Sequence, residues 1–494
     1  MNRARDLFLL SAVAVAGLIL LLRWNPDRTS RQGAKTPLVV YCAAGIKPPV
    51  EEAARAYEQI FRMPIQIQYG GSGTLLSNLR VARKGDLFLA ADESYLLTAR
   101  SNHLVKEIIP LSRIVPVIAV RRGNPKNVRT LSDLLRVELA LANPDAAAIG
   151  RITRELLTKS GEWTALEQHA RVFKPTVNDV ANDIKLGTVD AGIIWNATAS
   201  QYPELEIVGV PDLTSIDQRI AIGVLEFSQQ PTEALRFARY LGARDRGLKE
   251  FTKYGYEPFE GDVWAKTPEI VLFSGDVNRM AIDETIQQFE EREGARVTRV
   301  YNSCGILVSQ MKSGRRPDAY FACDTSFMYE VKNLFSDSVN ISATGMVLLL
   351  PKGNPKSLRT LADLAITGLR IGIANEEQSA LGGLTARVLR TQGLWDSVMS
   401  NVRVQAPTAE LLVNQMRTGS LDAVVVYAAN TSQVRDAFTV VPLSGLGTIA
   451  IQPFAIGKDS EHTFLTERLL ATLRESDSRK KFESAGFRWW AEGN

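Results

Sequence analysis

The chain repeats itself at an interval of about 230 residues, and this repeat limits the possible fold more than any other feature. The segment RRGNPKNVRTLSDLL begins at Arg121, and PKGNPKSLRTLADLA begins 230 positions later at Pro351. Likewise VDAGIIW at Val189 returns as LDAVVVY 232 positions later, at Leu421. Because the interval hardly changes along the chain, the sequence indicates a duplicated domain and not a solenoid of short repeats.

The repeat divides the chain into three parts. Its 494 residues, 45% of them hydrophobic, are enough for several domains of about 150 residues each. We place a signal-anchor and tether at residues 1–37, a first domain at residues 38–261 and a second domain at residues 269–490.

Within each copy, short apolar runs such as LVVY, DLFLA and AGIIW alternate with amphipathic stretches, for example residues 50–61 and 151–160. This alternation is typical of an α/β fold with a mainly parallel sheet. The run at residues 112–120 predicts a crossing into a second lobe, and residues 219–225 predict the return. We therefore expect two tandem bilobed α/β domains, each with a cleft at the carboxyl ends of its strands.

A glycine-rich turn, QYGGSGTLLSNL, spans residues 68–79. The alternating residues before it predict a strand, and Leu75, Leu76 and Leu79 predict one face of a helix. Unpaired N–H groups at such a helix start favour a bound anion. The alternative is an ordinary connection in which glycine permits the turn and serine caps the helix.

Two aspartates, Asp92 and Asp324, follow an apolar strand at corresponding places of the two copies. We expect them to cap helices or to fix the loops at the cleft. An aspartate directed at a bound anion would repel it.

The order of the motifs resembles the periplasmic molybdate-binding protein family, which are type II solute-binding proteins of ABC transporters. The motifs are YCAAGIKPPVEEAARAYE, QYGGSGTLL, GDLFLAADE, ANPDAAAIGRITRELL and GTVDAGIIW. The resemblance extends over both copies, so it implies two tandem periplasmic-binding-protein-like domains. It also implies a molybdate-like or tungstate-like oxyanion, held by serine hydroxyls, backbone N–H groups and a tyrosine, and passed to an ABC permease.

The resemblance implies a set of ligand-binding positions in each domain, and each set keeps only one of the family's three side-chain donors, Ser72 or Tyr427. We expect weaker binding than in a typical molybdate receptor, with backbone donors contributing. The alternative is a membrane-anchored sensor or scaffold that has lost tight ligand capture. The implied positions are Gly45, Ser72, Gly73, Ile149, Val177 and Trp195 in the first domain, and Val277, Cys304, Gly305, Leu381, Ala409 and Tyr427 in the second.

The family also brings the loops that carry Cys304 and Cys323 to one edge of the cleft. A disulfide between them is one interpretation, and two buried thiols are the other. The three cysteines and three histidines are dispersed, so we predict no metal site. Motifs of hydrolases, nucleotide-binding enzymes and metalloproteases are absent from the sequence, so we predict neither an enzyme nor a cofactor.

The N-terminal sequence MNRARD precedes an uncharged apolar run at residues 7–22. No small-residue cleavage pattern follows this run, so we expect an uncleaved single-pass anchor in the cell membrane, although a signal peptide is the alternative. We expect the body to be extracytoplasmic, in the periplasm. Lysine and arginine exceed aspartate and glutamate by only four and are scattered, so nucleic acid is not an expected partner.

Overall fold

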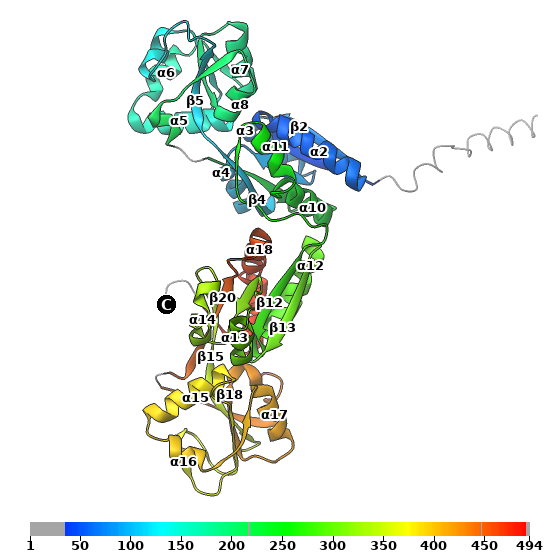
Figure 1. The fold of residues 1–494 in the computed structure, drawn as a ribbon, viewed down its shortest axis with the longest axis vertical. Coiled ribbons are helices and arrows are strands. Elements are labelled where there is room, and N and C mark those ends of the chain that lie inside the picture. The colour runs from blue at the N-terminus through cyan, green and yellow to red at the C-terminus, as the bar shows by residue number, and fades with distance from the viewer. Residues whose placement is uncertain (1–34, 216–217, 446, 491–494) are drawn as a thin grey trace, which may run out of the picture.

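The computed structural model describes residues 35–215, 218–445 and 447–490 (Figure 1). The predicted anchor at residues 7–22 lies outside the described residues. None of the helices in the described part of the chain is both long and apolar enough to span a membrane.

The first domain has two lobes, each built on its own sheet. We call the lobe with the six-stranded sheet the inner lobe and the other the outer lobe. The inner sheet has the order β11-β4-β10-β3-β1-β2, and the outer sheet has the order β7-β6-β8-β5-β9. The inner strands are β1 (Leu38–Ala43), β2 (Ile65–Gly70), β3 (Leu87–Ala90), β4 (Val105–Ile114), β10 (Gln218–Leu225) and β11 (Glu257–Pro258); the outer strands are β5 (Pro116–Arg121), β6 (Leu139–Ala142), β7 (Val172–Lys174), β8 (Ala191–Trp195) and β9 (Leu205–Val208).

The predicted crossings between lobes are confirmed. Strand β4 ends in the inner sheet and β5 begins the outer one, while β10 returns to pair with β3 and β4. The helices of this domain are η2 (Ala44–Ile46), α2 (Lys47–Phe61), α3 (Ser72–Ala82), α4 (Glu93–Ser101), η3 (Ser132–Arg136), α5 (Ala148–Ser160), α6 (Trp163–His169), α7 (Val177–Leu186), α8 (Asn196–Ser200), α9 (Pro211–Thr214), α10 (Pro231–Leu241) and α11 (Gly247–Lys253).

Helix α2 illustrates how the sequence sets these elements. Prolines occupy its first turn, where a missing N–H removes no helical hydrogen bond. Its buried residues Val50, Ala53, Ala54 and Tyr57 follow the spacing of one helical face, and this face packs into the core of the domain.

The second domain repeats this plan with its own inner and outer lobes. Its strands join into one ten-stranded sheet because β15 runs through both lobes. The strands are β12 (Glu269–Gly275), β13 (Arg296–Asn302), β14 (Ala319–Phe321), β15 (Val339–Pro351), β16 (Ile371–Ala374), β17 (Val402–Ala406), β18 (Ala423–Tyr427), β19 (Phe438–Pro442), β20 (Ile449–Ile456) and β21 (Arg488–Trp489). The helices are η4 (Asp276–Asn278), α12 (Arg279–Glu293), α13 (Cys304–Lys312), α14 (Thr325–Tyr329), η5 (Lys332–Leu334), η6 (Ala362–Ala365), α15 (Ala380–Thr391), α16 (Trp395–Met399), α17 (Ala409–Arg417), η7 (Ala428–Thr431), α18 (Thr463–Leu473) and α19 (Ser476–Ser484).

A proline accounts for the difference between β15 and the interrupted β4 and β5. The N–H of Met346 donates to the carbonyl of Thr448 at 2.8 Å and so continues the ladder. Pro116, at the corresponding place of the first copy, has no N–H to donate.

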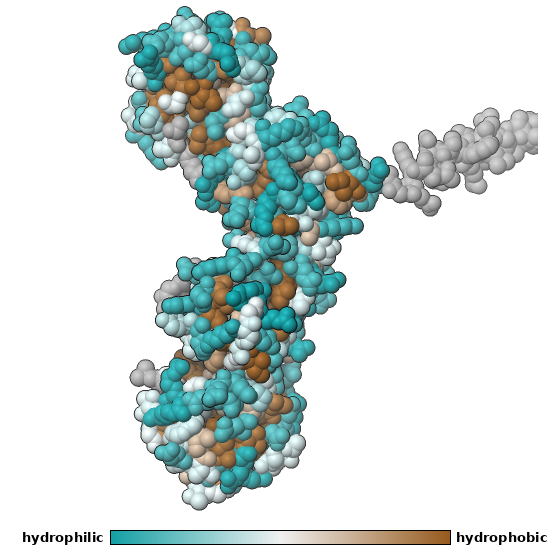
Figure 2. All heavy atoms as spheres, in the orientation of Figure 1, coloured by the Kyte–Doolittle hydropathy of each residue, from teal (hydrophilic) through white to brown (hydrophobic). Residues whose placement is uncertain are grey.

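The two inner lobes meet at the waist of an elongated molecule, and the outer lobes lie at its opposite ends (Figure 1). Each domain buries its own apolar core. Figure 2 shows a mostly hydrophilic face, with apolar side chains exposed in several separate places on the inner and outer lobes.

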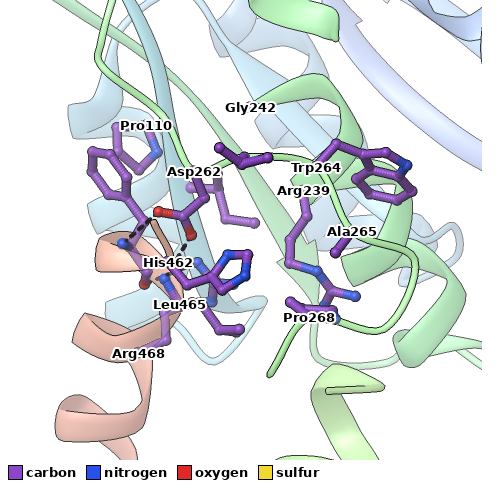
Figure 3. Close-up of a pocket in the computed structure, with 13 residues that line it drawn as sticks. Pro110, Arg239, Gly242, Asp262, Trp264, Ala265, Pro268, His462, Leu465 and Arg468 are labelled. Atoms are coloured by element: carbon purple, nitrogen blue, oxygen red, sulfur yellow. Dashed lines mark hydrogen bonds between the residues drawn. The ribbon is translucent and has the colours of Figure 1, made fainter. Parts of the chain in front are cut away.

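Buried charges join the two inner lobes. Glu293, at the end of α12, accepts from Arg239 of α10 at 2.8 Å and from Arg468 of α18 at 2.6 Å. Asp262, in the segment between the domains, accepts the N–H groups of Phe464 and Leu465 at 2.9 Å (Figure 3). Asp262, which directly follows the first domain, therefore holds the first turn of α18 in the second domain.

Candidate functional site

The cleft of the first domain lies where strands of both lobes end and helices begin. Its lining includes η2, which follows β1, and the starts of α3, α5 and α7. The N–H groups in the first turn of a helix have no acceptor within the helix, and the helix dipole adds positive potential there. The hollow between these elements is narrow, so only a small ligand would suit it.

Ser72 is the first residue of α3 and its side chain is almost fully buried at the cleft. Its Oγ accepts the N–H of Ala91 at 3.2 Å, and Ala91 directly follows β3. Because this contact uses a lone pair of the oxygen, the hydroxyl proton stays available to donate. The structure thus places one oriented O–H donor at the helix start.

The glycines of the turn bring the two lobes together. A Cβ on Gly71 would lie 2.3 Å from the carbonyl oxygen of Ala146, so only glycine fits at this approach. The N–H of Gly73 donates to the same oxygen at 2.9 Å. In this closed cleft the Gly73 N–H therefore joins the lobes, and Gly73 is not among the lining residues.

Gly45 lies opposite Val177, and the space that Val177 takes up leaves no room for a side chain at position 45. A Cβ at Gly45 would lie 2.8 Å from Cγ1 of Val177 and 3.4 Å from Oγ1 of Thr198. Thr198 is fully buried, and its hydroxyl has no hydrogen-bond partner among the described residues. A hydroxyl thus lies beside the position where the resemblance implies a serine.

Asp92 caps α4, as predicted, through a 2.9 Å hydrogen bond from the N–H of Ser94. It is buried next to the cleft but carries no uncompensated charge, because Arg151 of α5 donates to its carboxylate. Arg151 belongs to the outer lobe and Asp92 to the inner lobe. This ion pair joins the lobes and neutralises the nearby negative charge.

The structure brings together five of the six implied positions of the first cleft. They are Gly45, Ser72, Ile149, Val177 and Trp195. Trp195 is buried at the end of β8 and contributes an apolar wall. None of the described residues that line this cleft is charged.

The cleft of the second domain has the same position in the fold but a different chemistry. Its lining again includes five of the six implied residues: Val277, Cys304, Leu381, Ala409 and Tyr427. The N–H of the sixth, Gly305, donates to the carbonyl of Gln378 at 3.0 Å, as that of Gly73 does to Ala146 in the first domain.

A disulfide joins Cys304 and Cys323 in this cleft. The Sγ of Cys304 accepts the N–H of Cys323 at 3.0 Å, so it takes the place of the Ser72 oxygen. A disulfide sulfur has no proton to donate, so the second cleft lacks the O–H donor of the first.

Two carboxylates in the lining, and one beside it that forms no ion pair with a described residue, distinguish the second cleft. Asp276 and Glu410 line it. Asp324 caps α14, as predicted, but none of the described cations forms an ion pair with it. The position that corresponds to Arg151, 232 residues later, is Gly383. No group of three or more His, Cys, Asp or Glu side chains in the described part of the chain is arranged to hold a metal ion.

Comparison with known families decides the class of protein. A family model described as bacterial extracellular solute-binding protein matches residues 38–257 and 270–488. The chain belongs to this family. The match confirms the duplicated solute-binding fold, and the protein is a binding protein and not an enzyme.

Individual solute-binding relatives match about half of this chain. A Haemophilus influenzae protein named only as a binding protein is 30% identical over 224 residues, which cover 45% of this chain and 91% of the relative. A Bacillus subtilis protein named as an ABC transporter substrate-binding lipoprotein is 27% identical over 252 residues, which cover 49% of this chain and 95% of the relative. The molybdate-binding protein of Mycobacterium tuberculosis is 24% identical over 223 residues, which cover 44% of this chain and 84% of the relative.

Four residues that shape the clefts of this solute-binding protein are not singled out by the sequence analysis. Arg151 and Thr198 affect the first cleft, and Asp276 and Glu410 affect the second. A comparison of the two copies at the interval of 232 contains the signal for three of them. It pairs Arg151 with Gly383, Ala44 with Asp276, and Asn178 with Glu410.

Proposed function

We propose that this solute-binding protein captures a tetrahedral oxyanion, of the molybdate or tungstate kind, in its first cleft. The observation that carries the proposal is the uncharged lining of that cleft, where the Ser72 hydroxyl and the starts of three helices converge. Neutral donors and helix dipoles stabilise an anion and still permit its release.

The charge around the first cleft supports this proposal. Asp92 is the buried acid beside Ser72, and Arg151 compensates it. A small anion in this hollow would meet the Ser72 hydroxyl and the N–H groups that begin α5 and α7, at Ile149 and Val177. Gly45 and Trp195 offer no hydroxyl, so the affinity should be lower than that of a complete donor set.

The printed names of two relatives suggest the wider role. One is named as a substrate-binding lipoprotein of an ABC transporter and another as a molybdate-binding protein. We therefore infer that this protein delivers its ligand to an ABC permease. The apolar run at residues 7–22 would hold the extracytoplasmic body at the membrane. Recovery of a soluble mature chain that lacks this run would contradict the anchor.

A second candidate function is a membrane-anchored sensor or scaffold that has lost ligand capture. The observation that favours it is the loss of the hydroxyl at both Gly45 and Trp195. The buried, unpartnered hydroxyl of Thr198 beside Gly45 favours the binding function instead.

Calorimetric titration of the purified full-length chain separates the two candidates. Molybdate, tungstate, sulfate and phosphate are each titrated into the wild type and into the Ser72→Ala variant. We expect at least one oxyanion to bind with one site per chain, and the variant to bind it about tenfold more weakly. Absence of binding by all four oxyanions would favour the scaffold.

A further inference from the structure

We propose that the second cleft binds a small organic ammonium ion and excludes oxyanions. Two carboxylates face this cleft from opposite lobes. Asp276 lies in η4 of the inner lobe, and Glu410 lies in the first turn of α17 in the outer lobe. In the first copy, Ala44 and Asn178 take these places, and neither is charged.

The surroundings leave both carboxylates without a cation inside the cleft. Partial desolvation raises the pKa of the half-buried Asp276, and partial desolvation together with the charge of Asp276 raises the pKa of Glu410, although Glu410 is exposed to solvent. Arg279 opposes both effects, but its side chain is 61% exposed and bonds Asp283 at 3.3 Å. Among the described residues that line the cleft there is no lysine, arginine or histidine.

Unpartnered polar atoms give an independent sign of a ligand. Tyr427 and Ser303 both line the second cleft and are 3% and 5% exposed, yet neither hydroxyl oxygen has a hydrogen-bond partner among the residues that the structure describes. The side-chain oxygen of Asn430, which also lines the cleft, is likewise without a partner. An ammonium group offers three N–H donors and no acceptor, so it matches these oxygens and the two carboxylates.

The same cleft lacks the Ser72 hydroxyl of the first cleft and adds negative charge. The Cys304–Cys323 disulfide takes the place of that hydroxyl, and the carboxylates of Asp276 and Glu410 would repel an oxyanion. Glu410 lies in the first turn of α17, so its negative charge offsets the positive end of that helix at the cleft. The hollow between the lobes is narrow, which favours a small amine over a large one.

Calorimetric titration of the full-length chain tests the proposal. The probes are the chlorides of methylammonium, ethanolamine and putrescine, with sodium molybdate and sodium sulfate for comparison. We expect at least one amine to bind at one site per chain. The double variant Asp276→Asn/Glu410→Gln should weaken that binding at least about tenfold. Asp459→Asn, which removes a carboxylate whose side chain is 76% exposed and lies outside the cleft, should leave it unchanged.

Two further comparisons separate this proposal from the oxyanion function of the first cleft. Ser72→Ala should leave amine binding unchanged, and saturation with molybdate should not displace the amine. Absence of binding by all three amines would overturn the proposal, as would equal affinity of the wild type and the double variant. An oxyanion that occupies two sites per chain would also overturn it, while leaving the function of the first cleft intact.

Discussion

At the scale of single residues, the two clefts carry the larger side chain of one residue pair on opposite lobes. In the first cleft Gly45 lies opposite Val177, and Val277 and Ala409 take the corresponding places in the lining of the second cleft. Each cleft thus has one small and one branched residue at this pair of positions. A serine at position 45 therefore conflicts with Val177 and not with the chemistry of the site.

The first prediction restores the missing hydroxyl. Gly45→Ser alone should destabilise the first domain or leave oxyanion affinity unimproved, because its Cβ would lie 2.8 Å from Val177. The double variant Gly45→Ser/Val177→Ala should relieve this contact and tighten oxyanion binding about tenfold, the effect of one added hydrogen bond to a charged group. Calorimetry on both variants, with Val177→Ala as the control, measures the difference. Equal affinities for the three variants would contradict it.

The second prediction separates the two roles of Ser72. Ser72→Ala removes the O–H donor and also leaves the N–H of Ala91 unpaired, which should cost about 1–3 kcal/mol in the free energy of unfolding. In Ser72→Cys the sulfur can still accept the N–H of Ala91, as the sulfur of Cys304 accepts the N–H of Cys323. The thiol, however, is only a weak hydrogen-bond donor to an oxyanion. Denaturation and titration of both variants should show weaker oxyanion binding in each, with the larger loss of stability in Ser72→Ala. Unchanged affinity in both would reduce Ser72 to a structural role.

At the scale of elements, the starts of helices from both lobes converge on each cleft, and one ion pair determines the charge beside the first. Arg151 of α5 reaches the buried Asp92 that caps α4. In the second copy Gly383 leaves Asp324 without such a partner among the described residues. This single replacement contributes to the difference in charge between two clefts of the same fold.

The third prediction removes this ion pair. Arg151→Ala leaves the Asp92 carboxylate buried and uncompensated, so oxyanion affinity should fall about tenfold or more and the domain should lose stability. Arg154→Ala on the same helix breaks only an exposed pair with Asp145 and should have little effect on either quantity. Titration and thermal unfolding of both variants provide the check. Similar losses in the two variants would rule out a special role for Arg151.

Patterns of apolar residues and of the repeat predict most elements, and they predict the crossing between β4 and β5 and the aspartate caps. Contacts between distant segments are beyond such patterns. The sequence does not show that Arg151 reaches Asp92, that Val177 blocks Gly45, or that the Gly73 N–H joins the lobes. Each of these depends on how two lobes close on each other, which local periodicity does not encode.

At the scale of the whole molecule, the repeat alone suggests two separate domains, but buried charges connect them. Glu293 lies between Arg239 and Arg468, which come from different domains. Burial alone would raise the pKa of Glu293, but the two arginines outweigh it and hold the pKa below its usual value. The junction therefore holds the two inner lobes together at the waist of the molecule (Figure 1).

The fourth prediction concerns this junction. Glu293→Ala leaves two buried arginines without their partner and should lower the free energy of unfolding by about 3–5 kcal/mol, whereas the exposed Glu291→Ala should change it little. Since the folded-state pKa of Glu293 is depressed, its stabilisation is present above the usual glutamate pKa of about 4.3 and is lost as the pH falls through the folded-state value. The difference in the free energy of unfolding between the wild type and Glu293→Ala should therefore become smaller as the pH falls from 7 to 3. A constant difference across this range would contradict the assignment.

The most direct test of the account is to locate a bound oxyanion by its anomalous scattering. Crystals of the protein grown with tungstate should show one tungsten peak per chain, in the first cleft and within hydrogen-bond distance of the Ser72 hydroxyl through its oxygens. The second cleft, with Asp276 and Glu410 in its lining, should show none. A tungsten peak in the second cleft, or an empty first cleft in crystals of a chain that binds tungstate in solution, would contradict the account.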